Sequence, residues 1–275
     1  MVDAHVHFWK YNKIKDAWIT DKMKMLQRDF LPKHLKPELH GNEMDAIIAV
    51  QADQSESETG LLLSFVNENP EIKGIVGWVD LQNENVKERL DYFSKFNAIK
   101  GFRHIVQAEP AGFLQNKKFL NGIKAMQNFK FTYDILIYEN QLEDAIEFIN
   151  KFPDQKFILD HCAKPDIKNK NITEWEKSIH EIAKNKNLYC KLSGLTTETQ
   201  WNNWNEKDFK PYLDVVFDSF GTDRLLFGSD WPVMLLSGNY TNWKNLIEIY
   251  MTNFSLGEKQ KVFGNNAIKF YNLNS

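Results

Sequence analysis

Three histidines and an aspartate occupy positions in this chain where they could form a catalytic site. His5 and His7 are two residues apart in the run Asp-Ala-His-Val-His-Phe-Trp, near the amino terminus. Alternate residues of a β-strand share one face, so both imidazoles can point to the same side. His161 follows the apolar run Phe-Ile-Leu, and Asp230 follows Leu-Leu-Phe. Each alone is most simply a polar group bonded to nearby backbone, but four such groups at strand ends indicate a functional site.

Eight short runs rich in β-branched and aromatic residues predict the strands that carry these groups. They span residues 2–8, 45–52, 74–81, 99–106, 131–138, 156–163, 188–194 and 224–231. Helical periodicity follows most of them, at 56–69, 84–96, 141–152, 174–184 and 207–220, with a shorter stretch at 117–127. Alternating strands and helices predict a parallel sheet. Eight such units predict an α/β protein in which residues 1–275 form a single (β/α)8 TIM-barrel domain.

In such a barrel the carboxyl ends of the strands meet at one face, where active sites of this fold are built. The three histidines and the aspartate are therefore expected to converge there. Further candidates to bind a substrate or shape its pocket lie at or near strand ends: Gln51, Arg103, His104, Lys191 and Trp231. An ion pair or simple packing is an equally good explanation for each of them.

The connection between the first two predicted strands, residues 9–44, is far longer than the usual two to six residues. We expect it to form a lid over the barrel mouth, with Trp18 and Arg28 able to meet a substrate. Pro32 and Pro37 should restrict its backbone. The alternative is that the segment only seals the barrel edge in place of a missing first helix. Stretches at 240–252 and 256–270 predict helices that close the barrel.

Composition excludes several classes of partner. The chain has 34 Lys and Arg against 37 Asp and Glu, a net charge of -3, and no basic block, which argues against nucleic acid or anionic membrane as a partner. No apolar run reaches membrane-spanning length, and the amino terminus lacks a signal-peptide pattern, so a cytoplasmic protein is expected. Cys162 and Cys190 are expected to be packing residues. The oligomeric state, including a homo-oligomer, is left open.

Six motifs together resemble the amidohydrolase superfamily, and within it the amidohydrolase 2 family and its lactonase branch. They are Asp-Ala-His-Val-His-Phe-Trp (3–9), Gly-Trp-Val-Asp-Leu (77–81), Lys-Gly-Phe-Arg-His (100–104), Leu-Asp-His-Cys-Ala-Lys-Pro (159–165), Lys-Leu-Ser-Gly-Leu (191–195) and Phe-Gly-Ser-Asp-Trp-Pro-Val (227–233). The branch includes lactonases for L-fucono-, L-rhamnono- and 2-pyrone-4,6-dicarboxylate lactones. The resemblance implies a hydrolase that opens a small, sugar-derived lactone.

Most of that superfamily holds one or two divalent metals with the first-strand histidines, a fourth-strand Lys or Glu, histidines of strands five and six, and the eighth-strand Asp. This chain has no histidine in its fifth strand, and Arg103 ends the fourth, so a binuclear site is not expected. A single Zn²⁺ on His5, His7, His161 and Asp230 remains chemically possible. The resemblance instead favours catalysis that requires no metal, with Asp230 as general base and the three histidines donating hydrogen bonds to the lactone carbonyl.

Two other functions compete with this interpretation. A metal-dependent hydrolase or decarboxylase of the same superfamily would share the barrel and the His-x-His pair, but it would need a tightly bound metal. A barrel used only for binding would make one or more of the four polar groups dispensable. The sequence favours the lactonase, with a small-molecule lactone as its partner, and identifies neither the lactone nor its ring size.

Overall fold

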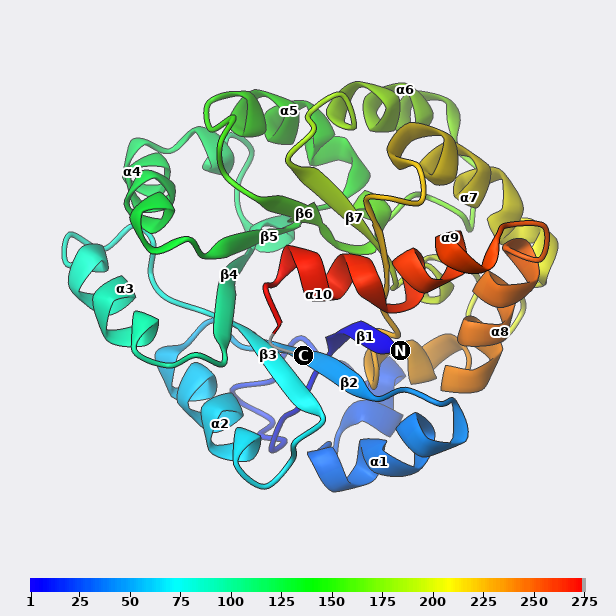
Figure 1. The fold of residues 1–275 in the computed structure, drawn as a ribbon, viewed down its shortest axis with the longest axis horizontal. Helices are drawn as coiled ribbons and strands as arrows, with labels where there is room; N and C mark the ends of the chain where they lie inside the picture. The colour runs from blue at the N-terminus through cyan, green and yellow to red at the C-terminus, as the bar shows by residue number, and fades with distance from the viewer. Residues whose placement is uncertain (274–275) are drawn as a thin grey trace.

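Eight parallel strands in sequential order form the centre of the protein, which we describe from a computed structural model covering residues 1–273 (Figure 1). The strands are β1 (Val2–Val6), β2 (Ala46–Val50), β3 (Ile72–Gly77), β4 (Ile99–Ile105), β5 (Thr132–Leu136), β6 (Phe157–Leu159), β7 (Leu188–Leu192) and β8 (Leu225–Phe227). Each predicted run contains one strand, although β3 begins two residues before its run. The predicted (β/α)8 barrel is confirmed.

Eight helices surround the strands: α1 (Pro32–Gly41), α2 (Glu56–Val66), α3 (Val86–Ser94), α4 (Lys117–Met126), α5 (Leu142–Asn150), α6 (Thr173–Ile182), α7 (Glu206–Phe220) and α8 (Tyr240–Tyr250). Side-chain caps fix where several begin. The Ser55 side chain accepts a hydrogen bond from the Glu58 amide at 3.2 Å, and Asn205 caps α7 in the same way. Each helix buries its apolar stripe against the outside of the barrel.

The first connection differs from the sequence prediction because it contains a regular helix. Helix α1 fills the first place in the outer ring, so no helix is missing there. Pro32 is its first residue, where proline loses no helical hydrogen bond, and Leu35 and Leu39 bury its inner face. The part of residues 9–44 that is free to cover the mouth is thus shorter than predicted. It contains the 3-10 helix η1 (Asp21–Leu26) and is tied at its ends by paired Trp9 and Phe30 backbones.

The carboxyl-terminal segment closes the amino-terminal end of the barrel, nearest the viewer in Figure 1. It consists of α9 (Leu256–Gln260), a π-helical turn (Lys261–Asn265) and α10 (Asn266–Phe270), within the predicted helical span. Residues of α10 and its end join inward-facing strand residues in a second buried core: Val2, Ala4, Ala46, Ile48, Val50, Val76, Ile158, Leu226, Ala267, Phe270, Tyr271 and Leu273. The barrel is therefore sealed at one end and can open only at the other.

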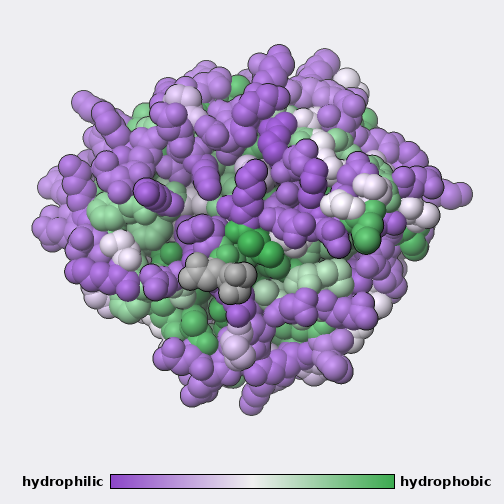
Figure 2. Space-filling model, viewed as in Figure 1, coloured by the Kyte–Doolittle hydropathy of each residue, from purple (hydrophilic) through white to green (hydrophobic). Residues whose placement is uncertain are grey.

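Hydrophilic side chains cover most of the face that carries α10, and hydrophobic side chains gather near its centre (Figure 2). Within residues 1–273, no helix has the length and apolar character needed to cross a membrane.

Asp3 joins the first and last strands where the barrel closes. One of its carboxylate oxygens accepts the His5 amide at 3.0 Å and the Ser229 amide at 2.9 Å, while the other accepts the Tyr240 hydroxyl at 2.7 Å. The carboxylate is fully buried, and burial raises its pKa against the effect of these bonds. The backbones of β1 and the segment after β8 add further bonds, such as the Asp230 amide to the His5 carbonyl at 2.9 Å. This seam positions both His5 and Asp230.

We predict that Asp3→Asn lowers the free energy of unfolding by about 3 kcal/mol. The new NH2 group cannot accept a hydrogen bond, so it would face a donor group that the carboxylate oxygen now binds. Urea denaturation followed by circular dichroism measures the loss. Asp91→Ala is the matched control, since its pair with Lys95 lies on the surface and contributes roughly 0.3–0.5 kcal/mol. Equal stability of Asp3→Asn and the wild type would show that the seam does not depend on this carboxylate.

Candidate active site

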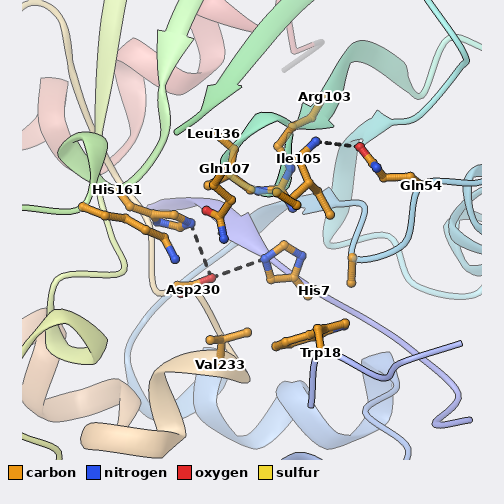
Figure 3. A pocket seen from close by; sticks show the side chains of 13 residues that line it. His7, Trp18, Gln54, Arg103, Ile105, Gln107, Leu136, His161, Asp230 and Val233 are labelled. Carbon is orange, nitrogen blue, oxygen red and sulfur yellow. Dashed lines mark hydrogen bonds and ion pairs between the residues drawn. The ribbon is translucent and has the colours of Figure 1, made fainter. Parts of the chain in front are cut away.

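Asp230 lies at the open mouth of the barrel with imidazoles around it (Figure 3). Its Oδ1 is 3.3 Å from His7 Nε2, 3.8 Å from His5 Nε2 and 3.9 Å from His161 Nε2. The imidazole rings of His5 and His7 are in contact, with their Nε2 atoms 3.1 Å apart. The structure therefore brings together all four residues that the sequence analysis selected.

His161 reaches this cluster from a left-handed turn and not from the strand that was predicted to carry it. Strand β6 ends at Leu159, and residues 161–164 then have positive φ angles of 55, 52, 58 and 49°. Such a conformation costs L-residues roughly 1–2 kcal/mol each. The indole of Trp175 donates to the Cys162 carbonyl at 2.8 Å and helps to hold the turn. Backbone strain is thus maintained beside the site, where it directs the His161 ring into the mouth.

Two neighbours from the end of β7 fix the orientation of the His161 ring. Its Nδ1 is 2.8 Å from the Ser193 hydroxyl oxygen. Gly194, with φ of 67°, lies so close that an added Cβ would be 2.5 Å from the same nitrogen. A glycine is therefore required there to leave room for the ring. With Ser193 donating to Nδ1, the neutral ring carries its proton on Nε2, which faces Asp230.

A network of buried charges lies beneath the cluster, inside the barrel. The Lys191 ammonium contacts Asp134 Oδ2 and lies 2.9 Å from Asp160 Oδ1 and 3.1 Å from His5 Nδ1. Arg103 Nη1 donates to Asp160 Oδ2 at 2.9 Å and lies 3.3 Å from His5 Nε2. The two cations balance the two carboxylates, as buried charges require. His5 is therefore held between two cations.

These surroundings determine which groups of the site are charged. Burial lowers the pKa of His5 well below its usual value, and Lys191 lowers it further. Burial also lowers the pKa of His161 to about 4, although Asp230 opposes the shift. Burial alone would raise the pKa of Asp230, but His161, His7 and His5 outweigh it and keep that pKa below the ordinary range. At neutral pH, His5 and His161 are thus uncharged and Asp230 is a carboxylate.

The two interior carboxylates respond differently to the same lysine. Burial raises the pKa of Asp134 to about 6, despite the attraction of Lys191. For Asp160, Lys191 and His5 outweigh burial and keep the pKa well below its usual value. Both carboxylates are therefore ionised at neutral pH. The Tyr271 hydroxyl, next to α10, donates to Asp134 Oδ2 at 3.0 Å and links the closed end of the barrel to this network.

A cavity of about 290 Å³ opens above the cluster, close to the lower end of the range for small-ligand pockets. Asp230, His7, His161 and Arg103 line its floor and sides. Its remaining wall residues are Trp18, Ala52, Gln54, Ile105, Gln107, Ala108, Leu136, Lys164 and Val233. His5 is not among the lining residues because the other site residues cover it, and it is fully buried.

The candidate substrate-binding residues separate into two groups. Trp18 and Arg103 line the cavity, and Trp18 is 40% exposed on the covering segment. Gln51 and Lys191 lie below it, fully buried, where Gln51 accepts from Arg103 Nη2 at 3.3 Å and donates to the Arg103 carbonyl at 3.2 Å. Gln51 and Lys191 were expected to contact the substrate, but they lie too deep to do so. We instead expect Gln51 to position Arg103 and Lys191 to position His5.

Three other candidates lie away from the cavity. His104 donates to Glu109 at 2.8 Å and stacks on Phe113 beneath the connection that follows β4. Trp231 packs against Phe30 and is 3% exposed. Arg28 lies 4.7 Å above the same Phe30 ring. Each of these side chains is thus already engaged: His104 by an ion pair, Trp231 by apolar packing and Arg28 by stacking. We therefore revise their expected role from substrate binding to support of the barrel mouth.

Sequence reasoning missed Asp134, Asp160 and the wall residues Gln54, Gln107 and Lys164. A signal for the first two existed: each is a lone acid in or beside an otherwise apolar strand, and a buried carboxylate there needs a cation or hydrogen-bond donors around it. No comparable signal marked the wall residues. They lie on connections whose paths across the mouth are not encoded by periodicity.

The donor atoms at the mouth fit one divalent cation. His5, His161 and Asp230 each offer a ligand atom within 4.8 Å of the others. His7 Nδ1 donates to the Val50 carbonyl at 2.8 Å, which leaves Nε2, 3.3 Å from Asp230 Oδ1, as the ring nitrogen that could bind a cation. Imidazole nitrogen and carboxylate oxygen suit Zn²⁺. A second cation does not fit, since Lys191 and Arg103 already supply positive charge beneath the cluster.

This fold and site define a (β/α)8 barrel that places imidazoles of β1 and the β6 turn around a carboxylate that follows β8. The chain belongs to the amidohydrolase family, whose model, described as Amidohydrolase, matches residues 2–273.

Relatives of known name cover nearly the whole chain. An L-fucono-1,5-lactonase of Burkholderia multivorans is 34% identical over 99% of this chain and 96% of its own length, and one of Burkholderia ambifaria is 30% identical over 99% and 95%. An amidohydrolase structure from Burkholderia multivorans with bound zinc is 34% identical, has a TM-score of 0.96 and is aligned over 99% of both chains. The resemblance to the lactonase branch is thereby confirmed.

Proposed function

We propose that this protein hydrolyses a sugar-derived lactone, with L-fucono-1,5-lactone as the first substrate to test. One observation carries the proposal: the ionised Asp230 faces a small cavity with His7 and His161 beside it. A carboxylate and imidazoles at one point can move a proton and polarise a carbonyl, which are the two requirements of ester hydrolysis. The names of the relatives support the choice of substrate.

Asp230 acts as general base on the attacking water. As the water oxygen bonds to the carbonyl carbon, one water proton passes to Asp230 Oδ1. His7 Nε2 lies 3.3 Å from the same oxygen, and its Nδ1–H is bonded to the Val50 carbonyl, so His7 is held in place beside the proton that Asp230 takes up. When the bond between the carbonyl carbon and the ring oxygen breaks, the proton passes to the departing oxygen. The product is an open-chain hydroxy acid.

His161 donates Nε2–H to the lactone carbonyl oxygen, where negative charge develops during attack. Its neutral ring and the Ser193 contact at Nδ1 support this role. His5 has a different role from the one first expected. It is covered by the other groups and does not line the cavity, so it supports His7 and Asp230 from below.

We further propose that hydrolysis requires no metal. Lys191 and Arg103 place fixed positive charge beside His5, and His161 can polarise the carbonyl without a Lewis acid. The donor set would hold a zinc ion through His7, His161, Asp230 and His5, and a bound ion would supply carbonyl polarisation. The zinc bound in the related amidohydrolase keeps the metal-dependent alternative open to direct test.

Asp230→Asn should reduce kcat on L-fucono-1,5-lactone at least about 100-fold, because the amide cannot accept the water proton. Asparagine tolerates the left-handed conformation of residue 230, so the fold should persist. Steady-state rates from acid release, with circular dichroism as the folding check, measure the effect. The exposed Asp154→Asn serves as control. Retention of more than about a tenth of wild-type kcat would rule out the general-base role.

Activity should survive exhaustive dialysis against a strong chelator, because the proton transfer and the carbonyl hydrogen bond come from side chains. Lactonase rates and metal content are measured on the same sample, before and after dialysis and after Zn²⁺ is added back. Loss of activity that Zn²⁺ restores would favour the metal-dependent hydrolase instead.

Trp18→Ala should lower kcat/KM unequally across a series of aldonolactones, by about tenfold for the best substrate, or ~1.4 kcal/mol for one aromatic contact. Trp18 lines the cavity, whereas Arg28 on the same segment does not, so Arg28→Ala should leave the substrate preference unchanged. Comparison of kcat/KM for each variant and lactone provides the measurement. An equal loss for every lactone would indicate a structural role for Trp18.

A further inference from the structure

Lys164 is a charged residue of the cavity wall that the mechanism above does not use. It ends the left-handed turn that begins at His161, with φ of 49°. The strained turn brings both side chains, three residues apart, to the same cavity. Its side chain is 18% exposed, so the ammonium is partly shielded from water yet open to a ligand.

The present contacts of Lys164 are loose compared with those of the other cavity cation. Its Nζ lies 3.6 Å from Glu198 Oε1 and 5.6 Å from the centre of the Tyr138 ring. Arg103 is instead bonded to Asp160 at 2.9 Å and is 3% exposed. Burial raises the pKa of the Glu198 carboxyl, although Lys164 opposes this shift. The 3.6 Å separation from Glu198 and the position of Lys164 in the cavity wall leave its ammonium able to contact an anion bound there.

Hydrolysis of an ester creates negative charge in two stages on the carbonyl oxygen. Attack by water makes an oxyanion, and loss of the acid proton to solvent then leaves a carboxylate on the product. His161 offers a single N–H to this charge, and the Nδ1–H of His7 is already bonded to the Val50 carbonyl. A nearby ammonium would stabilise both stages.

We propose that Lys164 binds this developing negative charge, as the oxyanion during attack and as the carboxylate of the aldonate product. This inference rests on the proposed lactonase function for its first half. Its second half, the binding of an aldonate anion, can be tested without any turnover.

Lys164→Met keeps the length of the stem and removes the charge, and Lys164→Asn suits the left-handed backbone should the first variant fail to fold. Lys168→Met is the matched control, since Lys168 is exposed in the neighbouring groove and does not line the cavity. Steady-state kinetics use L-fucono-1,5-lactone. Isothermal titration calorimetry uses the L-fuconate anion and neutral L-fuconamide, which differ in charge at the carbonyl group.

Removal of the ammonium should lower kcat about 100-fold, as loss of one oxyanion donor does, with a much smaller change in KM. L-fuconate should bind about tenfold more weakly, or ~1.4 kcal/mol, while L-fuconamide binding stays the same. Lys168→Met should match the wild type in all three measurements.

The proposal is overturned if kcat and L-fuconate affinity persist without the ammonium, or if the wild type does not bind L-fuconate. A loss of thermal stability with both quantities unchanged would assign Lys164 to the fold alone. A wild type that binds L-fuconate through Lys164 but opens no lactone would instead refute the lactonase proposal and retain the anion site.

Discussion

Lys191 is fully buried inside the barrel, where its ammonium meets carboxylates from β5 and from the end of β6. An isolated ammonium there would be very costly, so Asp134 and Asp160 must be ionised and close. Asp160 then holds Arg103, while burial and the nearby Lys191 ammonium keep His5 uncharged. The arrangement at the mouth follows from this one requirement of charge balance. Removing any member would leave its partner buried without compensation.

The cluster above this network combines strain with rigid support. Four consecutive left-handed residues beside His161, and a fifth at Asp230, are unfavourable in isolation. The Trp175 indole, the Ser193 hydroxyl and the backbone seam between β1 and β8 offset that cost. The result is a carboxylate oxygen with three imidazole nitrogens held within 3.9 Å of it, which leaves little reorganisation for the reaction itself.

Periodicity was sufficient to predict the barrel, because each βα unit repeats one pattern of burial. The same logic placed His5, His7, His161 and Asp230 together, since strand ends must meet in a closed sheet. Strand position alone could not separate Lys191 from Arg103, because both lie on strands. Lys191 lies below the site, whereas Arg103 also reaches the cavity. Periodicity also missed helix α1 and the residues of the connections, such as Lys164. Their positions depend on how loops pack, and no repeating pattern records that.

The closed end of the barrel has a consequence for how the chain is made. Tyr271 donates to Asp134, and the residues around it complete the inner core beneath the buried charges. During synthesis, β1 leaves the ribosome before β8. The seam at Asp3 can form only after the segment that follows β8 has also emerged. The network around Lys191 stays open to water until residue 271 has also left the ribosome. Until then the nascent barrel carries unsealed strands and hydrated interior charges, and this interval is when chaperones have most to protect.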